Sequence, residues 1–342
     1  MICYLSRNYK GIDNAGNKAK TDIEEIMDGL CFKNVGLKRT FYTNSVAAFF
    51  FTFMGILKFP FNIHKGDVLI LQYPLKKYYT YVCRLAHIRG CKVVTVIHDL
   101  GSFRRKRLTT AKEINRLMCS DYIISHNAYM KQWLQDKGCD VPLGELEIFD
   151  YLSESNVAKK EIAFQLPCKV LYVGALASKK NNFLYKMENY VNSYKFALYG
   201  SGFELESIKE KERFIYRGFL PFEKLISTVD GDFGLVWDGD SIEACTGNFG
   251  EYLRYNNPHK TSLYIRCGLP VIIWEKAAMA SFVSKHKIGF CIASLDQLDK
   301  LLASVSQDEY AEMKANVLQI GDRLSQGFYF SKAINKAIQS LK

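Results

Sequence analysis

The sequence predicts an α/β protein made of two doubly wound, Rossmann-like domains. Short apolar runs recur along the whole chain, and each run ends in glycine or in polar residues. Runs of this kind are typical of parallel strands that are covered by helices on both faces. Stretches with helical periodicity separate the runs, and a chain of 342 residues has the length of about two domains.

The first half begins with a short apolar run at residues 2–5, followed by a glycine-containing loop at residues 8–20. Thr21 and Glu24 have the spacing of a capping box, so we expect a helix to begin at Thr21. Strands and helices then alternate. Strands are expected at 68–72, 92–97 and 122–124, and helices at 78–89, 110–118 and 127–137.

The apolar run from Val46 to Leu57 is too short to span a membrane, for which about 20 residues are needed. The simplest interpretation is a buried helix. The alternative is an interfacial segment that lies in a membrane surface, because Lys58 and residues 59–61, Phe-Pro-Phe, suit such an anchor.

The second half repeats the pattern of the first. The stretch with the weakest pattern between the halves is 140–168, so we predict domains at 1–152 and 153–325, with a last helix at about 326–342 packing back on the first. Two such domains that face each other leave a cleft at the carboxyl ends of both sheets, where ligands bind in these folds. Strands of the second domain are expected at 169–173, 196–199, 233–237, 271–274 and 289–292.

The net charge of +11 is concentrated in the first half. Residues 1–150 carry 22 Lys and Arg against 14 Asp and Glu, a net charge of +8, whereas residues 151–342 carry 24 against 21. Such an excess favours an anionic partner, which leaves phosphates, an anionic membrane surface or a nucleic acid open.

The ten cysteines form no C-x-x-C pair and have no zinc-ligand spacing. Several lie inside apolar runs, so we expect buried, inert thiols in a reducing compartment. The sequence begins without a signal peptide. These features predict a cytoplasmic protein, which could lie at the inner face of the cell membrane.

The stretch from Tyr255 to Thr261 is the strongest indication of a ligand site. It predicts a polar loop, with Asn256, and then a short helix with Pro258 at or just before its first turn. The first N–H groups of a helix have no partner within it and lie at the positive end of its dipole, so a diphosphate fits there. Asn257 and Lys260 are placed to add a neutral donor and a positive charge. An ordinary capped helix with surface Asn and Lys is the open alternative.

Other expected strand ends in the first half also carry polar residues. Gly16 and Asn17 belong to the loop at 8–20, whose glycines would let the backbone approach a ligand closely. His98 and Asp99 end an apolar strand, and an aspartate at such a place can act as a general base. The alternative for residues 8–20 is a simple flexible loop. The alternative for Asp99 and His98 is a capping aspartate beside a core histidine. A basic run follows, which includes Arg104, Arg105 and Arg107. It could contact phosphates or a membrane surface, or it could be an ordinary solvated face.

In the second half, Lys179 follows the strand at 169–173, and Tyr199 and Gly200 precede a turn where a base or ribose could approach. Asp238 and Asp240 form a D-x-D string, but the glycine between them favours a simple turn, so no metal is expected. The sequence contains neither G-x-G-x-x-G nor a Walker A pattern, which argues against nicotinamide and ATPase functions.

The chain resembles bacterial GT-B glycosyltransferases of the galactofuranosyltransferase and accessory glucosyltransferase type. The resemblance covers nearly the whole chain. The commoner pattern of retaining GT-B enzymes, two glutamates separated by seven residues, is not evident, and the Asn257–Lys260 segment stands in its place. The motifs that carry the resemblance are residues 16–23, 96–100, 124–127, 148–152, 250–252 and 256–260.

The resemblance implies a GT-B fold, a UDP-sugar donor held by the C-terminal domain and a glycan acceptor, possibly lipid-linked, held by the N-terminal domain. It assigns Asn257 and Lys260 to the diphosphate, with Tyr255 and Asn256 beside them. Lys179, Gly16 and Asn17 would close over the donor. Relatives suggest a homo-oligomer.

The expected reaction is direct displacement with inversion and without a metal, because Lys260 and helix N–H groups would stabilise the departing UDP. An N-domain carboxylate would deprotonate the acceptor, with Asp99 as first choice, Asp13 as second and His98 as the fallback. One alternative stays open, a non-catalytic peripheral membrane protein that binds lipid-linked glycans. Nucleic-acid binding rests on charge alone and is not expected.

Overall fold

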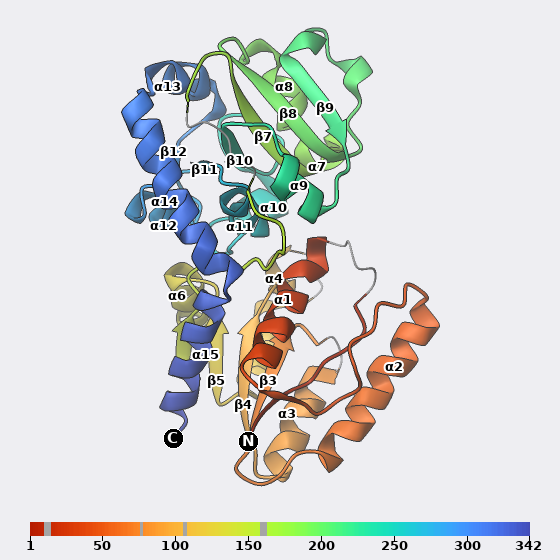
Figure 1. Cartoon of the computed structure of the whole chain (residues 1–342). Helices are drawn as coiled ribbons and strands as arrows, with labels where there is room; N and C mark the ends of the chain where they lie inside the picture. Colours follow the sequence, from red (N-terminus) through yellow and green to blue (C-terminus); the bar gives the residue numbers. More distant parts are fainter. Residues whose placement is uncertain (10–14, 76–77, 105–107, 158–162) are drawn as a thin grey trace. The chain divides into compact units, whose positions relative to one another are not determined.

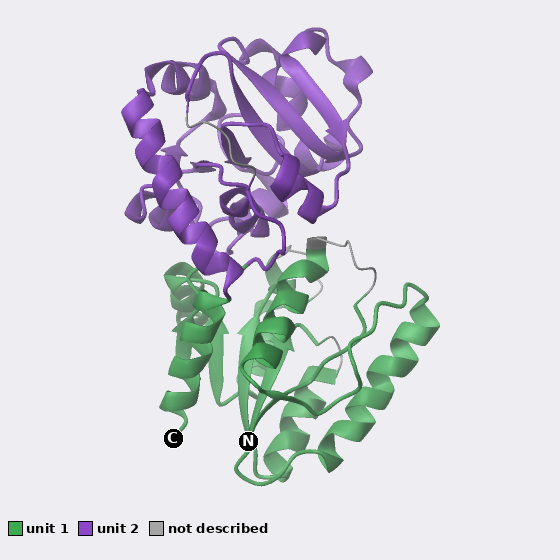
Figure 2. Ribbon diagram, viewed as in Figure 1, with its two compact units in different colours: residues 1–150, 327–342 green, residues 151–326 purple. Residues whose placement is uncertain are grey.

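The computed structural model divides the chain into two compact units. Unit 1 comprises residues 1–150 and 327–342, and unit 2 comprises residues 151–326 (Figure 2). The last helix thus belongs to the unit that contains the amino terminus. The residues that the structure describes are 1–9, 15–75, 78–104, 108–157 and 163–342.

Unit 1 contains a six-stranded sheet in the order β2-β1-β3-β4-β5-β6, with every neighbouring pair parallel (Figure 1). Its strands are β1 (Ile2–Tyr4), β2 (Lys33–Asn34), β3 (Val68–Tyr73), β4 (Lys92–Ile97), β5 (Tyr122–Ser125) and β6 (Leu143–Glu145). Its helices are α1 (Ala15–Gly29), α2 (Ser45–Lys58), α3 (Tyr79–Ile88), α4 (Gly101–Arg104), α5 (Thr110–Leu117), α6 (Ala128–Asp136) and α15 (Phe328–Ser340).

Unit 2 contains a second parallel sheet of six strands, in the order β12-β11-β10-β7-β8-β9. Its strands are β7 (Cys168–Ala175), β8 (Tyr194–Ser201), β9 (Phe214–Gly218), β10 (Phe233–Val236), β11 (Val271–Trp274) and β12 (Gly289–Ile292). Its helices are α7 (Ser178–Asn181), α8 (Phe183–Lys186), α9 (Phe222–Thr228), α10 (Gly247–Tyr252), α11 (His259–Arg266), α12 (Ala280–Lys285), α13 (Leu298–Ser304) and α14 (Gln307–Ser325).

The apolar runs form the cores of both units, which confirms the predicted fold class. All residues of β10 and β11 are buried, and so are all but the first residue of β4. Strands buried on both faces require the continuous apolar runs that the sequence contains. Three strands escaped prediction, β2, β6 and β9, because they are short or partly exposed.

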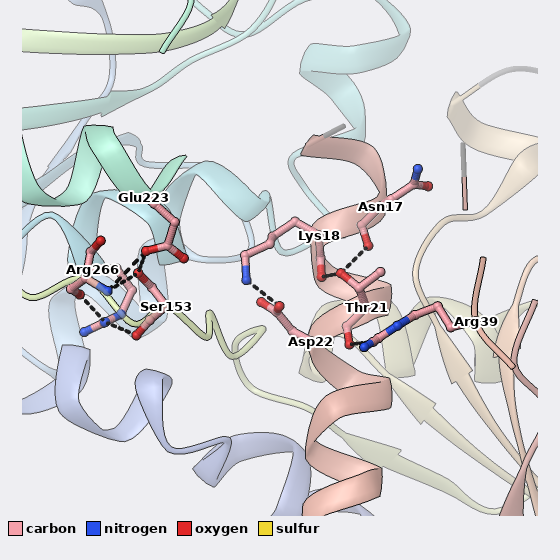
Figure 3. Close-up of polar contacts among 9 residues, drawn as sticks. Asn17, Lys18, Thr21, Asp22, Arg39, Ser153, Glu223 and Arg266 are labelled. Carbon is pink, nitrogen blue, oxygen red and sulfur yellow. Dashed lines mark hydrogen bonds and ion pairs between the residues drawn. The ribbon is translucent and has the colours of Figure 1, made fainter. Parts of the chain in front are cut away.

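The predicted capping box is wrong, because α1 begins at Ala15 and Thr21 lies inside it. The Thr21 hydroxyl donates to the backbone oxygens of Lys18 and Asn17, and Lys18 pairs with Asp22 one turn on (Figure 3). The buried Glu24 carboxylate accepts hydrogen bonds from Ser6 and Tyr9 instead of from the helix start. Tertiary partners have therefore replaced the local cap.

The expectation of a buried helix at 46–57 is also wrong for one side of α2. Its small residues Ala48 and Gly55 are buried together with Ile56, whereas most of its large apolar side chains are exposed. In the described parts of the chain, no helix is both long and apolar enough to cross a membrane.

The last helix is fixed to unit 1 by Asp150. Its carboxylate accepts from the backbone N–H groups of Tyr329 and Phe330, at 3.1 and 2.6 Å, at the start of α15. Gly327 precedes the helix with a φ of +69°, and a side chain there would collide with Ile26 of α1. Burial raises the pKa of Asp150 to about 7.

The cysteines are free thiols, as expected, and seven of the ten are buried. Burial raises the pKa of Cys3, Cys83 and Cys267 to about 12, so these thiols stay protonated and unreactive. Three cysteines depart from the expectation, because Cys31 is exposed and Cys119 and Cys291 are partly exposed.

Candidate functional site

The predicted loop, helix, turn and strand around Lys260 are present in unit 2. Pro258 is the N-cap residue of α11, Gly268 follows the helix with a φ of +69°, and β11 begins at Val271. Lys260 therefore lies in the first turn of α11.

Lys260 reaches the carboxyl ends of two neighbouring strands. Its ammonium group donates to the Tyr172 hydroxyl at 2.7 Å and to the Asp238 carboxylate at 2.9 Å. Tyr172 comes from β7, and Asp238 follows β10. The ammonium also lies 4.1 Å from the centre of the Tyr172 ring, a favourable cation–π geometry. Burial raises the pKa of Tyr172, so its hydroxyl stays protonated and can donate to Asp238, at 3.0 Å.

The same ammonium has a third and longer contact, 3.4 Å from the backbone oxygen of Trp237. Lysine has three N–H donors, and each one has a partner here. A phosphate oxygen would therefore have to share or replace a contact, and the Trp237 oxygen is the weakest of the three partners. The lysine is held in position rather than extended into solvent, with 19% of its side chain exposed.

Glycines bring the ends of β7 and β8 close together beside Lys260. Gly174 and Gly200 are paired across the two strands, with φ angles of +144° and +146°. A Cβ at Gly200 would lie 1.8 Å from the Gly174 oxygen, and one at Gly174 would lie 3.5 Å from Lys260 Cε. Gly200 is therefore needed for strand packing. Tyr199 is buried in the core, and Lys179 is exposed in α7.

The D-x-D string, predicted as a turn, lies at a bend of the chain. Gly239 has a φ of +121°, a Cβ there would lie 2.5 Å from the Thr246 oxygen, and the Asp240 N–H donates to the Thr246 hydroxyl at 3.1 Å. Asp238 is paired with Lys260. Among the residues that the structure describes, no group of three or more His, Cys, Asp or Glu side chains could hold a metal ion.

The loop before α11 is partly buried. Asn257 is 4% exposed, and the side-chain oxygen of Asn256 is buried without a hydrogen-bond partner among the residues that the structure describes. A buried acceptor without a donor is costly, so a donor from a ligand would stabilise it. Tyr255 is half-buried and completes the set predicted to lie beside a diphosphate.

In unit 1, His98 and Asp99 directly follow β4, as predicted. The His98 Nε2 lies 2.6 Å from the side-chain oxygen of Gln72, and the imidazole stacks on Phe149 with ring centres 5.3 Å apart. The Gln72 amide nitrogen donates to Tyr9 and to the Lys20 oxygen, so its oxygen is the acceptor and His98 Nε2 carries the proton. Gln72 thus fixes both the orientation and the tautomer of His98.

The helix start that follows Asp99 is already occupied by a carboxylate of the chain. Glu113 is fully buried and accepts from the N–H groups of Gly101 and Ser102, each at 2.8 Å, and from the Tyr73 hydroxyl. The start of α4 therefore does not provide free donors for a phosphate.

Three more of the predicted site residues of unit 1 lie in helices. Gly16 and Asn17 lie in the first turn of α1 and not in a loop. Arg104 ends α4. Asp13, Arg105 and Arg107 lie outside the described residues.

Two family models cover most of this chain. The N-terminal domain model of glucosyltransferase 3-like proteins matches residues 2–148, and the C-terminal domain model matches residues 170–337. The chain belongs to the glucosyltransferase 3-like family. It is a glycosyltransferase with a GT-B fold.

Two full-length relatives support this assignment. The beta-1,6-galactofuranosyltransferase WbbI of Escherichia coli is 29% identical over 330 residues, which is 96% of each chain. Glucosyltransferase 3 of Streptococcus parasanguinis is 20% identical over 99% of this chain and 98% of its own. Among solved structures, an O-GlcNAc transferase variant of Thermobaculum terrenum has a TM-score of 0.52 at 13% identity. The match covers 99% of this chain and 66% of the O-GlcNAc transferase chain. At this level of identity the likeness shows the fold alone.

Sequence reasoning missed the residues that hold the predicted ones in place. Tyr172 and Asp238 anchor Lys260, and Gln72 orients His98. Each of the three lies in or just after an apolar run. A polar side chain in or just after an apolar run, on a strand next to the site, was the signal that could have identified them.

Proposed function

We propose that the protein transfers a hexosyl group, galactofuranose or glucose, from a UDP-sugar to a hydroxyl of a glycan acceptor. Both sugars are taken from the names of its relatives. Such a reaction would serve the assembly of a bacterial surface polysaccharide or glycoprotein. The observation that carries the proposal is the immobilised Lys260 ammonium at the carboxyl ends of β7 and β10.

Lys260 would stabilise the negative charge that develops on the departing UDP. A fixed cation in a partly buried site needs little reorganisation during the reaction, which makes its electrostatic contribution large. The diphosphate would take the place of the Trp237 oxygen, while Asp238 and Tyr172 keep the lysine in position. Asn257 and Asn256 would add neutral contacts.

This arrangement does not need a metal ion. The carboxylate that would serve as a metal ligand, Asp238, is engaged with Lys260 at 2.9 Å. We therefore propose metal-independent transfer by direct displacement with inversion.

The acceptor hydroxyl would be deprotonated in unit 1. Asp99 follows β4 and is half-buried, so it can accept a proton while keeping some contact with solvent. His98, held by Gln72 and Phe149, is the second choice among the described residues.

The test is product formation from defined substrates. UDP-galactofuranose and UDP-glucose would each be incubated with a panel of glycan acceptors, and UDP release and the anomeric configuration of the product would be measured. The proposal predicts acceptor-dependent UDP release and inverted configuration. Retained configuration would refute the direct displacement, and release from GDP-, ADP- or CMP-activated sugars alone would refute the UDP donor.

A further inference from the structure

The outer side of α2 and the turn after it carry a row of large apolar side chains that are between 37% and 82% exposed. Phe50 is 56% exposed, Val46 is 77% exposed, and Phe61, in the 3-10 turn after the helix, is 82% exposed. Figure 1 shows α2 at the outer edge of unit 1. We call this row the α2 apolar face; its members are Val46, Phe49, Phe50, Phe53, Met54, Leu57 and Phe61.

The spacing of these residues makes one continuous stripe. Within α2, the exposed positions recur at intervals of three and four residues from Val46 to Leu57, which places them on one side of a helix. The opposite side, with Ala48, Gly55 and Ile56, is buried, and Gly55 packs against Leu37. Apart from Ile56, the helix therefore turns small residues inward and most of its large apolar residues outward, the reverse of an ordinary surface helix.

The segment of the chain that contains α2 carries basic residues and no acidic ones. Between Asp28 and Asp67 the chain contains no acidic residue, whereas it contains five basic ones: Lys33, Lys38, Arg39, Lys58 and Lys65. Lys58 is in the last turn of α2 itself.

The whole unit has the same bias. Residues 1–150 have a net charge of +8, and residues 327–342 add three lysines and no acid, so unit 1 carries the entire net charge of +11 and unit 2 carries none. The split by structural unit is thus sharper than the split by sequence halves.

We infer that the α2 apolar face is a membrane-docking surface, which inserts into the interfacial region of an anionic lipid bilayer. Exposed aromatic and aliphatic side chains on a helix that ends in Lys58, within a basic segment, match what such an interface binds. Anionic lipids attract basic segments that lie near the membrane surface. A second copy of the chain is a less favourable partner for this face. Symmetric contact through it would bring together two copies of unit 1, each with a net charge of +11.

The inference does not depend on the proposed sugar transfer, because vesicle binding is measured without substrates. The full chain would be sedimented with vesicles of phosphatidylcholine alone and of phosphatidylcholine with phosphatidylglycerol. The test variant carries Val46→Ser, Phe50→Ser and Phe61→Ser, which remove apolar surface without changing charge. The matched control is Phe219→Ser in unit 2, where the phenylalanine is 62% exposed.

We expect wild type and control to bind the anionic vesicles, and the triple variant to bind about 100-fold more weakly, since each substitution removes much of an apolar side chain from the interface. A Phe50→Trp variant should show a blue-shifted emission that brominated lipids quench. Equal binding by the triple variant, or no binding by wild type, would overturn the inference. A third outcome would also overturn the inference: neither protein binds vesicles, and wild type forms oligomers that the triple variant does not form.

Discussion

The pairing of Lys260 with Asp238 leads to a prediction that separates a ligand role of the lysine from a structural one. The perturbation is Lys260→Met, which keeps most of the side-chain volume but removes the charge. Among the described residues, the Asp238 carboxylate, which is 13% exposed, would then keep the Tyr172 hydroxyl as its one side-chain partner. Removing one partner of a fully buried pair costs 3–5 kcal/mol, so this partly exposed pair should cost about 2–3 kcal/mol. For a unit of this size, that lowers the melting temperature by about 5–10 °C.

The variant should also bind UDP more weakly. Loss of a charge-assisted hydrogen bond of about 1.5–3 kcal/mol predicts an affinity roughly ten- to a hundredfold lower. Weak binding by this variant alone is ambiguous, because an unpaired Asp238 would itself repel a diphosphate.

The double variant Lys260→Met with Asp238→Asn resolves the ambiguity. It removes both charges, so calorimetric stability should return to within about 1 kcal/mol of wild type. UDP affinity measured by titration calorimetry should stay low, because the cation is still missing. Lys287→Met, which breaks an exposed ion pair with Glu312, is the control and should change neither quantity by more than about 1 kcal/mol. Wild-type UDP affinity in the double variant would refute the placement of the diphosphate at Lys260.

Three further predictions concern the metal, the base and pH. EDTA should leave transfer unchanged, because Asp238 is paired with Lys260; restoration of lost activity by magnesium or manganese would contradict this. Asp99→Asn should lower turnover by about 10²–10⁴-fold at unchanged UDP affinity; near-normal turnover together with an inactive His98→Asn would move the base to His98. Burial raises the pKa of Glu24 and of Asp150 to about 7 in the folded chain, above the pKa that each carboxyl has in the unfolded chain. The folded state therefore binds these protons more tightly, which stabilises unit 1 at low pH. This stabilisation is lost as the pH rises through 7. Melting curves from pH 5 to 8 should show a loss of about 2–3 kcal/mol for each group, which Glu24→Gln with Asp150→Asn should abolish; an unchanged pH profile would show that neither group titrates in this range.

The sequence was sufficient to predict the fold because its strands are buried on both faces. An apolar run such as Lys92–Ile97 predicts a strand that is buried on both faces of a sheet. The polar residues that follow it mark the edge of the sheet where ligands bind. The edge strand Lys33–Asn34 has no such signal, since it is polar and only two residues long.

The errors arose where tertiary contacts override a local pattern. Thr21 and Glu24 fit a capping box, but the carboxylate is taken by Ser6 and Tyr9. The apolar run of α2 suggests burial, yet composition alone cannot indicate which side of a helix faces solvent. The partners of Lys260 come from positions 88 and 22 residues away, a distance that no motif covers.

The central claim, a UDP-sugar donor bound by unit 2, is tested most directly by titration calorimetry of the wild-type chain with UDP, GDP, ADP and CMP. A ligand that binds the folded state alone also raises the melting temperature, which provides an independent check. We predict measurable binding and a raised melting temperature for UDP, and much weaker effects for the other three. Preference for another nucleotide, or no binding of UDP by the folded protein, would contradict the proposed function.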